Sequence, residues 1–197
     1  MFEFNEKDAL SSGGSEVVGK KCLDSGVYDI TINTASKDTA STGTTGITWN
    51  FTVEGAKYPN TIYGFWTNKA NGDKIFNFDT LMALMGLEGI TALTEYEKTI
   101  EIKDGTKKVT AYKELDGIKC QIAVQKVLDV YNGEVTEKNE IKAFLNTDGK
   151  TYAEATRGSE AKQKAYYNTK MGDKETVAYK KFNAEADVEE APSASLL

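Results

Sequence analysis

The sequence predicts a mainly β domain in which one short helix separates the third strand from the fourth. Apolar and polar residues alternate in several segments, which is the pattern of half-buried strands. These segments are residues 26–34, 45–54, 60–67, 117–131 and 138–146. A helix is expected over residues 79–87, where Leu81, Leu84 and Met85 recur at helical spacing after the capping residue Asp79.

Three strands followed by a helix and two further strands is the element order of a five-stranded OB-type barrel, a fold that commonly binds oligonucleotides or oligosaccharides. Residues 98–112 predict a small hairpin inserted before the fourth strand. Residues 151–168 predict a C-terminal helical segment that is broken at Gly158. We therefore expect an N-terminal extension, one domain with its helical segment, and a disordered acidic tail, with bounds 1–22, 23–182 and 183–197.

Alternation in the second and third strands predicts which aromatic rings face the core. Side chains in a strand point to opposite faces in turn, so residues two apart share a face. This rule assigns Trp49, Phe51 and Trp66 to the core. It assigns Tyr63 and Phe65 to the outward face of the third strand.

The residue types of the chain exclude several kinds of catalytic and metal site. The sequence has no histidine, which is the commonest general base and metal ligand. Its two cysteines, Cys22 and Cys120, are too few for a structural zinc site. We therefore expect no enzymatic activity, no cofactor and no metal. No apolar run reaches the roughly 20 residues of a membrane span, and no secretory signal is recognisable, so we expect a cytoplasmic protein with reduced thiols.

Charge is distributed unevenly along the chain. The net charge is −6, of which residues 183–197 contribute −4, so that the other 182 residues carry −2. A locally basic surface can bind phosphate even when the net charge of the protein is negative. Only one of the 24 basic residues is an arginine, the side chain that most often reads base edges. Any binding of nucleic acid is therefore expected to be indifferent to sequence.

Aromatic and lysine side chains on the outward parity of the strands predict a surface for single-stranded nucleic acid. Bases stack on exposed rings for about 1–3 kcal/mol each, while lysines neutralise the phosphates. The expected residues are Tyr58, Tyr63, Phe65 and Phe144 for stacking and Lys69, Lys74, Lys119, Lys126 and Lys142 for phosphate. The alternative, that these rings pack under the inserted hairpin or the C-terminal helix, stays open from the sequence.

Several short segments resemble phage-encoded single-stranded DNA-binding proteins with an OB fold. These segments are Leu23-Asp24-Ser25-Gly26-Val27-Tyr28, residues 47–53, the helix over residues 81–89, Leu115-Asp116-Gly117-Ile118-Lys119 and Asn139-Glu140-Ile141. The resemblance covers roughly residues 23–146. It implies support of DNA replication or recombination in the host cytoplasm, no catalysis and often an acidic C-terminal tail. The tail of this chain ends in Leu196-Leu197, where related tails often end in an aromatic residue.

The expected function is therefore sequence-independent binding of single-stranded DNA. The rival interpretation is a phage structural or assembly protein whose β domain only packs against other proteins. Four acids in the tail, Glu185, Asp187, Glu189 and Glu190, are candidates for competing with DNA or for binding replication and recombination proteins. The alternative for the tail is a solubilising terminus.

Overall fold

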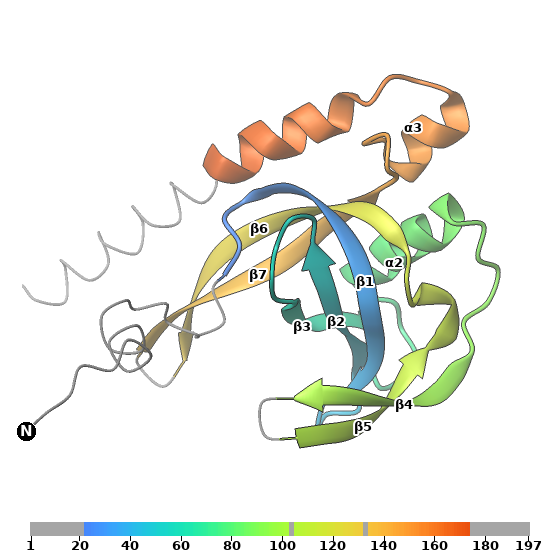
Figure 1. Ribbon diagram of the computed structural model, residues 1–197, viewed down its shortest axis with the longest axis vertical. Helices are drawn as coiled ribbons and strands as arrows, with labels where there is room; N and C mark the ends of the chain where they lie inside the picture. The colour runs from blue at the N-terminus through green and yellow to red at the C-terminus, as the bar shows by residue number, and fades with distance from the viewer. Residues whose placement is uncertain (1–21, 103–104, 132–133, 174–197) are drawn as a thin grey trace, which may run out of the picture.

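A computed structural model of the chain describes residues 22–102, 105–131 and 134–173 (Figure 1). The described residues include seven strands and four helical segments. The strands are β1 (Gly26–Thr39), β2 (Thr45–Val53), β3 (Asn60–Asn68), β4 (Glu95–Ile102), β5 (Gly105–Tyr112), β6 (Lys119–Tyr131) and β7 (Glu134–Leu145). The helices are α2 (Phe76–Leu87), the short η1 (Lys113–Leu115), α3 (Tyr152–Arg157) and a further helical run at residues 162–173.

The seven strands form one antiparallel sheet in which the long β1 is the central element. One path through the sheet runs β3-β2-β1-β5-β4, and the first half of β1 also pairs with β6, which pairs with β7. Strands β3 and β7 contact each other, but no hydrogen-bonded ladder joins them in the described part of the chain. The sheet is therefore not closed, and an open seam runs between β3 and β7.

Most predicted elements are present in the predicted order. The mainly β character, the helix after the third strand and the inserted hairpin are confirmed, with the hairpin formed by β4 and β5. The expected break at Gly158 is also confirmed. This residue ends α3 in the left-handed conformation, with φ of +64°, which a residue without a Cβ adopts at little cost.

One large core lies between α2 and the inner faces of the strands. Trp49, Phe65 and Phe144 form its centre, where the ring centroids of Trp49 lie 5.5 Å from those of Phe65 and 5.1 Å from those of Phe144. Such edge-on and tilted ring contacts add to the stabilisation that burial itself provides. The expected core positions of Trp49 and Phe51 are confirmed.

A β-bulge in β3 overturns two of the predicted orientations. Ile47 pairs with Phe65 and Trp49 pairs with Ile62, so two residues of β3 oppose one residue of β2. Gly64 takes a φ of +71° in this bulge. The extra residue shifts the alternation, so Phe65 points inward and is 3% exposed. The outward orientation predicted for Phe65 is therefore wrong.

The same bulge places Trp66 on the outer face of β3, so its predicted core position is also wrong. Trp66 pairs with Gly46, which lies on the side of β2 opposite to the core residue Ile47. Trp66 is half-buried and does not belong to the core cluster.

A second bulge, at Lys142 in β7, corrects the prediction for Phe144. Ala123 pairs with Ala143 and Val124 pairs with Ile141, which leaves Lys142 as the extra residue. Phe144 consequently points into the core and is 1% exposed. Its predicted outward position is wrong because strict alternation does not hold across the bulge.

The outer side of β6 and β7 forms a second, smaller core beneath the helical run 162–173 (Figure 1). Met171 of that run packs with Ala123, Ala143 and Leu145, and Tyr167 lies beside them. Both faces of this part of the sheet are therefore buried, which parity alone does not predict.

Candidate nucleic-acid interface

The outer side of β1, β2 and β3 carries a connected set of polar side chains, which we call the polar face: Thr31, Asn33, Asn50, Thr52 and Thr61. The register pairs Thr31 with Thr52 and Asn50 with Thr61, so these side chains point to the same side of the sheet. Asn33 is the extra residue of a bulge in β1. All five are half-buried.

Hydrogen bonds across the strands hold the polar face in place. Asn33 Nδ2 donates to Asn50 Oδ1 at 3.0 Å and to Thr52 Oγ1 at 2.9 Å. Asn50 Nδ2 donates to Thr61 Oγ1 at 3.2 Å. Amides and hydroxyls retain further donors and acceptors after one or two such bonds, so this surface can also bind a polar ligand.

Two aromatic residues of β3 border the polar face on one side. Tyr63 is 56% exposed within the bulge. Trp66 lies against Gly46 so closely that a Cβ at this position would come within 2.9 Å of the indole ring and within 2.5 Å of Phe65 O. Only glycine at position 46 lets the backbone of β2 and the Trp66 ring approach each other in this way.

Lysines border the other side of the polar face. Lys119, at the start of β6, is exposed and pairs with Thr31, so the two side chains share a face. Lys98 of β4 donates from Nζ to Asn33 O at 2.7 Å and lies 2.7 Å from Asp116 Oδ2. Lys107 of β5 is exposed and pairs with Ile100 of β4. Ile100 is two residues from Lys98, so Lys107 and Lys98 lie on the same side of the hairpin.

Asp116 holds Lys98 and Tyr96 of β4 in place. Its Oδ2 accepts hydrogen bonds from Lys98 Nζ and from the hydroxyl of Tyr96. The hydrogen bond to Asp116, together with burial, raises the pKa of Tyr96, so the hydroxyl stays protonated as the donor. The inserted hairpin is thereby tied to the loop that precedes β6.

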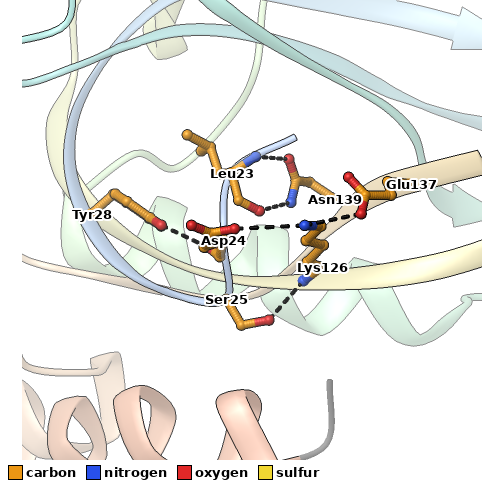
Figure 2. A network of polar contacts seen from close by, with 7 residues as sticks. All are labelled: Leu23, Asp24, Ser25, Tyr28, Lys126, Glu137 and Asn139. Carbon is orange, nitrogen blue, oxygen red and sulfur yellow. Dashed lines mark hydrogen bonds and ion pairs between the residues drawn. The ribbon is translucent and has the colours of Figure 1, made fainter. Parts of the chain in front are cut away.

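Lys126, a predicted phosphate ligand, instead belongs to a polar network that holds the N-terminal strap, residues 22–25 (Figure 2). Its side chain is 14% exposed, and Nζ lies 3.0 Å from Glu137 Oε1 and 3.6 Å from Asp24 Oδ1. Its backbone N–H donates to Ser25 Oγ at 3.0 Å. The expected outward, open position of Lys126 is therefore wrong, because two carboxylates on other segments surround its charge.

The other predicted residues are distributed over three places. Tyr58 is 64% exposed in the turn before β3, with Lys57 Nζ 5.2 Å from its ring centroid. Lys69 and Lys74 lie between β3 and α2, the first 3.9 Å from Asp73 Oδ2 and the second with Nζ 4.5 Å from the Phe78 ring centroid.

Lys142 lies beside the open seam, with Nζ 2.6 Å from Glu140 Oε2, and lines a groove together with Tyr63. The structure thus groups Tyr63 with Lys142 at the seam, and it places Lys119 on the far border of the polar face.

Trp66, Phe76, Lys98 and Lys107 are the surface residues that alternation did not identify. For Trp66 a signal exists, since a glycine inside a strand, here Gly64, often marks a bulge. The approach of Lys98 to Asn33, 65 positions earlier in the chain, has no counterpart in the sequence pattern.

Cys120 is a buried free thiol. Burial raises the pKa of the Cys120 thiol to about 12, which keeps it protonated and unreactive. Among the described residues, no group of three or more histidine, cysteine or acidic side chains is arranged to hold a metal ion. None of the helices in the described ranges combines the length and apolar character that a membrane span requires.

The predicted tail residues Glu185, Asp187, Glu189 and Glu190 lie outside the described residues. Comparison with known proteins adds no relative: the sequence matches no protein-family model and no curated protein sequence.

Proposed function

We propose that the chain binds single-stranded DNA along the polar face, without sequence preference, and supports phage DNA replication or recombination. The observation that carries this proposal is the composition of the polar face and its borders. A hydrogen-bonding centre lies between the aromatic residues Tyr63 and Trp66 on one side and the exposed Lys107 and Lys119 on the other. Rings that stack on bases and lysines that follow the backbone are the two components of sequence-tolerant binding to single strands.

We also infer that β1, β2, β3, β6 and β7 correspond to an OB-type barrel, with β4 and β5 as the inserted hairpin. Two features support this inference. The long β1 pairs with both β2 and β6, and α2 follows β3 and packs against β3 and β7. The open seam between β3 and β7 then lies where a closed barrel would join its last pair of strands.

A salt titration with matched variants tests the proposed function. The wild-type protein should bind oligo-dT, and its log affinity should fall as log salt rises. The double variant Lys107→Gln/Lys119→Gln should show a shallower slope by about 0.7 per lost phosphate contact. The control Lys162→Gln/Lys170→Gln removes the same charge from the helical run 162–173 and should leave the slope unchanged.

The rival function, a phage structural or assembly protein, makes the opposite prediction for the same titration. A domain that only packs against other proteins has no reason to release counterions from DNA, so oligo-dT should not bind. Binding that is equally reduced in the two double variants would mean that general charge, and not the polar face, attracts the strand.

The tail supports a second test of the proposed function. Four acids lie within positions 185–190. An anionic segment that belongs to the same chain as a cationic surface has a high effective concentration at that surface. Deletion of residues 184–197 should tighten oligo-dT binding at low salt, with a difference that narrows as salt rises. Equal affinities at low salt would assign the tail to solubility alone.

A further inference from the structure

The open seam between β3 and β7 contains a groove of about 100 Å³. We call it the seam groove, and its lining includes Tyr63, Phe76, Asn77, Asn139, Glu140 and Lys142. Because no hydrogen-bonded ladder joins the two strands in the described part of the chain, the groove is open along their edges. Tyr63 lines the groove and also borders the polar face, so a DNA strand that lies on the polar face can reach the groove directly.

Two exposed rings line the seam groove. Phe76, the first residue of α2, is 68% exposed, and Tyr63 is 56% exposed. A ligand that covers an exposed phenylalanine removes apolar surface from water, which favours binding. Flat rings of this kind offer a face on which another flat ring can stack.

Lys142 brings a positively charged group to the groove. Its Nζ lies 2.6 Å from Oε2 of Glu140, and both residues line the groove. An ammonium group carries three donor hydrogens, so Lys142 can bind Glu140 and still donate to the phosphate that adjoins a nucleobase.

A fixed amide completes the lining. Asn139 Oδ1 accepts from Leu23 N at 2.8 Å, and Asn139 Nδ2 donates to Leu23 O at 2.7 Å (Figure 2). These two bonds to one backbone residue set the orientation of the amide, and they use only one of the two Nδ2 hydrogens. The N-terminal strap thus fixes the orientation of the amide of a residue that lines the groove.

We propose that the seam groove holds one unstacked nucleobase of a bound single strand. The base packs against Phe76 and Tyr63, its edge faces Asn139, and the adjoining phosphate contacts Lys142. This inference rests on the proposed function and adds to it a specific place where one base leaves the stack. Phosphate alone is not the ligand, since the rings that line the groove contribute only when a base is present.

A comparison of two oligomers tests the base pocket. One is oligo-dT, and the other is an abasic oligomer of equal length, which keeps the phosphates and lacks the bases. Phe76→Ala should weaken binding of oligo-dT by about 5- to 150-fold, the equivalent of the 1–3 kcal/mol of one base–aromatic stack. Affinity for the abasic oligomer should not change. Phe76→Tyr keeps the ring and should bind like the wild type.

Tyr166→Ala is the matched control, because Tyr166 is 49% exposed and lies on the helical run 162–173, away from the groove. It should leave both affinities unchanged. Wild-type binding of oligo-dT with no loss in Phe76→Ala would overturn the base pocket alone, as would equal losses for both oligomers. Failure of the wild type to bind oligo-dT at all would overturn the proposed function and the base pocket with it.

Discussion

Two outer surfaces of the same sheet differ in whether another element covers them. On β1, β2 and β3 the outward side chains form the polar face, and its asparagines and threonines bond to one another across the strands. On β6 and β7 the outward Ala123, Ala143 and Leu145 lie beneath Met171 and are buried. The composition of the two surfaces agrees with this difference, since the covered one is apolar and the open one is polar.

The comparison shows how far strand parity can be used. Alternation tells which side chains share a face, but it does not tell whether a helix will cover that face. It also fails at each bulge, where the following residues change sides. The two aromatic residues that were assigned wrongly as outward, Phe65 and Phe144, each follow a bulge.

The largest expected effect separates two nearby residues of β3, Phe65 and Tyr63, of which the first is buried and the second exposed. Phe65→Ala should lower the free energy of unfolding by about 3–5 kcal/mol, because a buried ring leaves a cavity. Tyr63→Ala removes an exposed ring and should change it by less than about 0.5 kcal/mol. Urea denaturation of both variants measures the difference. Equal losses would mean that Tyr63 is as much a core residue as Phe65.

The cover over β6 and β7 can be tested at Met171. Met171→Ala should lower the free energy of unfolding by about 2–3 kcal/mol, since the side chain fills the small core between the helical run and the sheet. Hydrogen exchange should rise first at the amides of residues 162–173. Tyr166→Ala, on the same run, should have little effect. Unchanged exchange in Met171→Ala would show that other contacts hold the run in place.

Glycine-to-alanine substitutions in the β3 bulge and in the helical run 162–173 should change stability in opposite directions. Gly64 has a φ of +71°, so Gly64→Ala should destabilise the fold by about 1–2 kcal/mol. Gly172 lies in the helical run, and nothing stands within 4 Å of a Cβ added there. Gly172→Ala should therefore stabilise by about 0.5–1 kcal/mol. Thermal unfolding of both variants measures these effects. Stabilisation by Gly64→Ala would contradict the bulge, and destabilisation by Gly172→Ala would contradict the open space around a Cβ at that position.

A pH-dependent effect is expected at the carboxylate that joins α3 to the helical run. Glu154 Oε2 accepts from Thr151 N at 2.9 Å in a capping box, and Oε1 accepts from Gln163 N at 2.9 Å. Burial of the carboxyl opposes ionisation, but these hydrogen bonds outweigh it and lower the pKa of Glu154.

Because the folded-state pKa of Glu154 is lowered, its contribution to stability is present above the ordinary glutamate value of about 4.3 and is lost as pH falls through the folded-state value. Glu154→Gln should cost about 1 kcal/mol near pH 7, and the difference from the wild type should shrink in acid. Urea denaturation at pH 7 and below pH 4 tests this. A difference that does not depend on pH would assign the effect to shape and not to charge.

Local patterns were sufficient to predict much of the fold. The order of strands, the helix after the third strand, the inserted hairpin and the break at Gly158 each depend on residues within a few positions of one another. Turn residues, helical spacing and alternation are local properties, so they can be recognised in the sequence without a structure. The outward position of Tyr63 was also predicted, and it falls before the shift in alternation.

The candidate site was predicted less completely, because its geometry depends on distant segments. Lys126 was predicted to be an outward phosphate ligand, yet Asp24 and Glu137 surround its charge. Asn139 is oriented by Leu23, 116 positions away. Neither partner can be inferred from the residues around Lys126 or Asn139.

The sequence by itself determined the kinds of element, their order and the residue chemistry available: a β-rich chain with many lysines, a single arginine and no histidine. Only the tertiary structure decided which outward side chains remain accessible. The physical reason is that register and cover are relations between segments. The pairing of β3 with β2 creates the bulge at Gly64, and the packing of residues 162–173 on β6 and β7 buries one outer face while the polar face stays open.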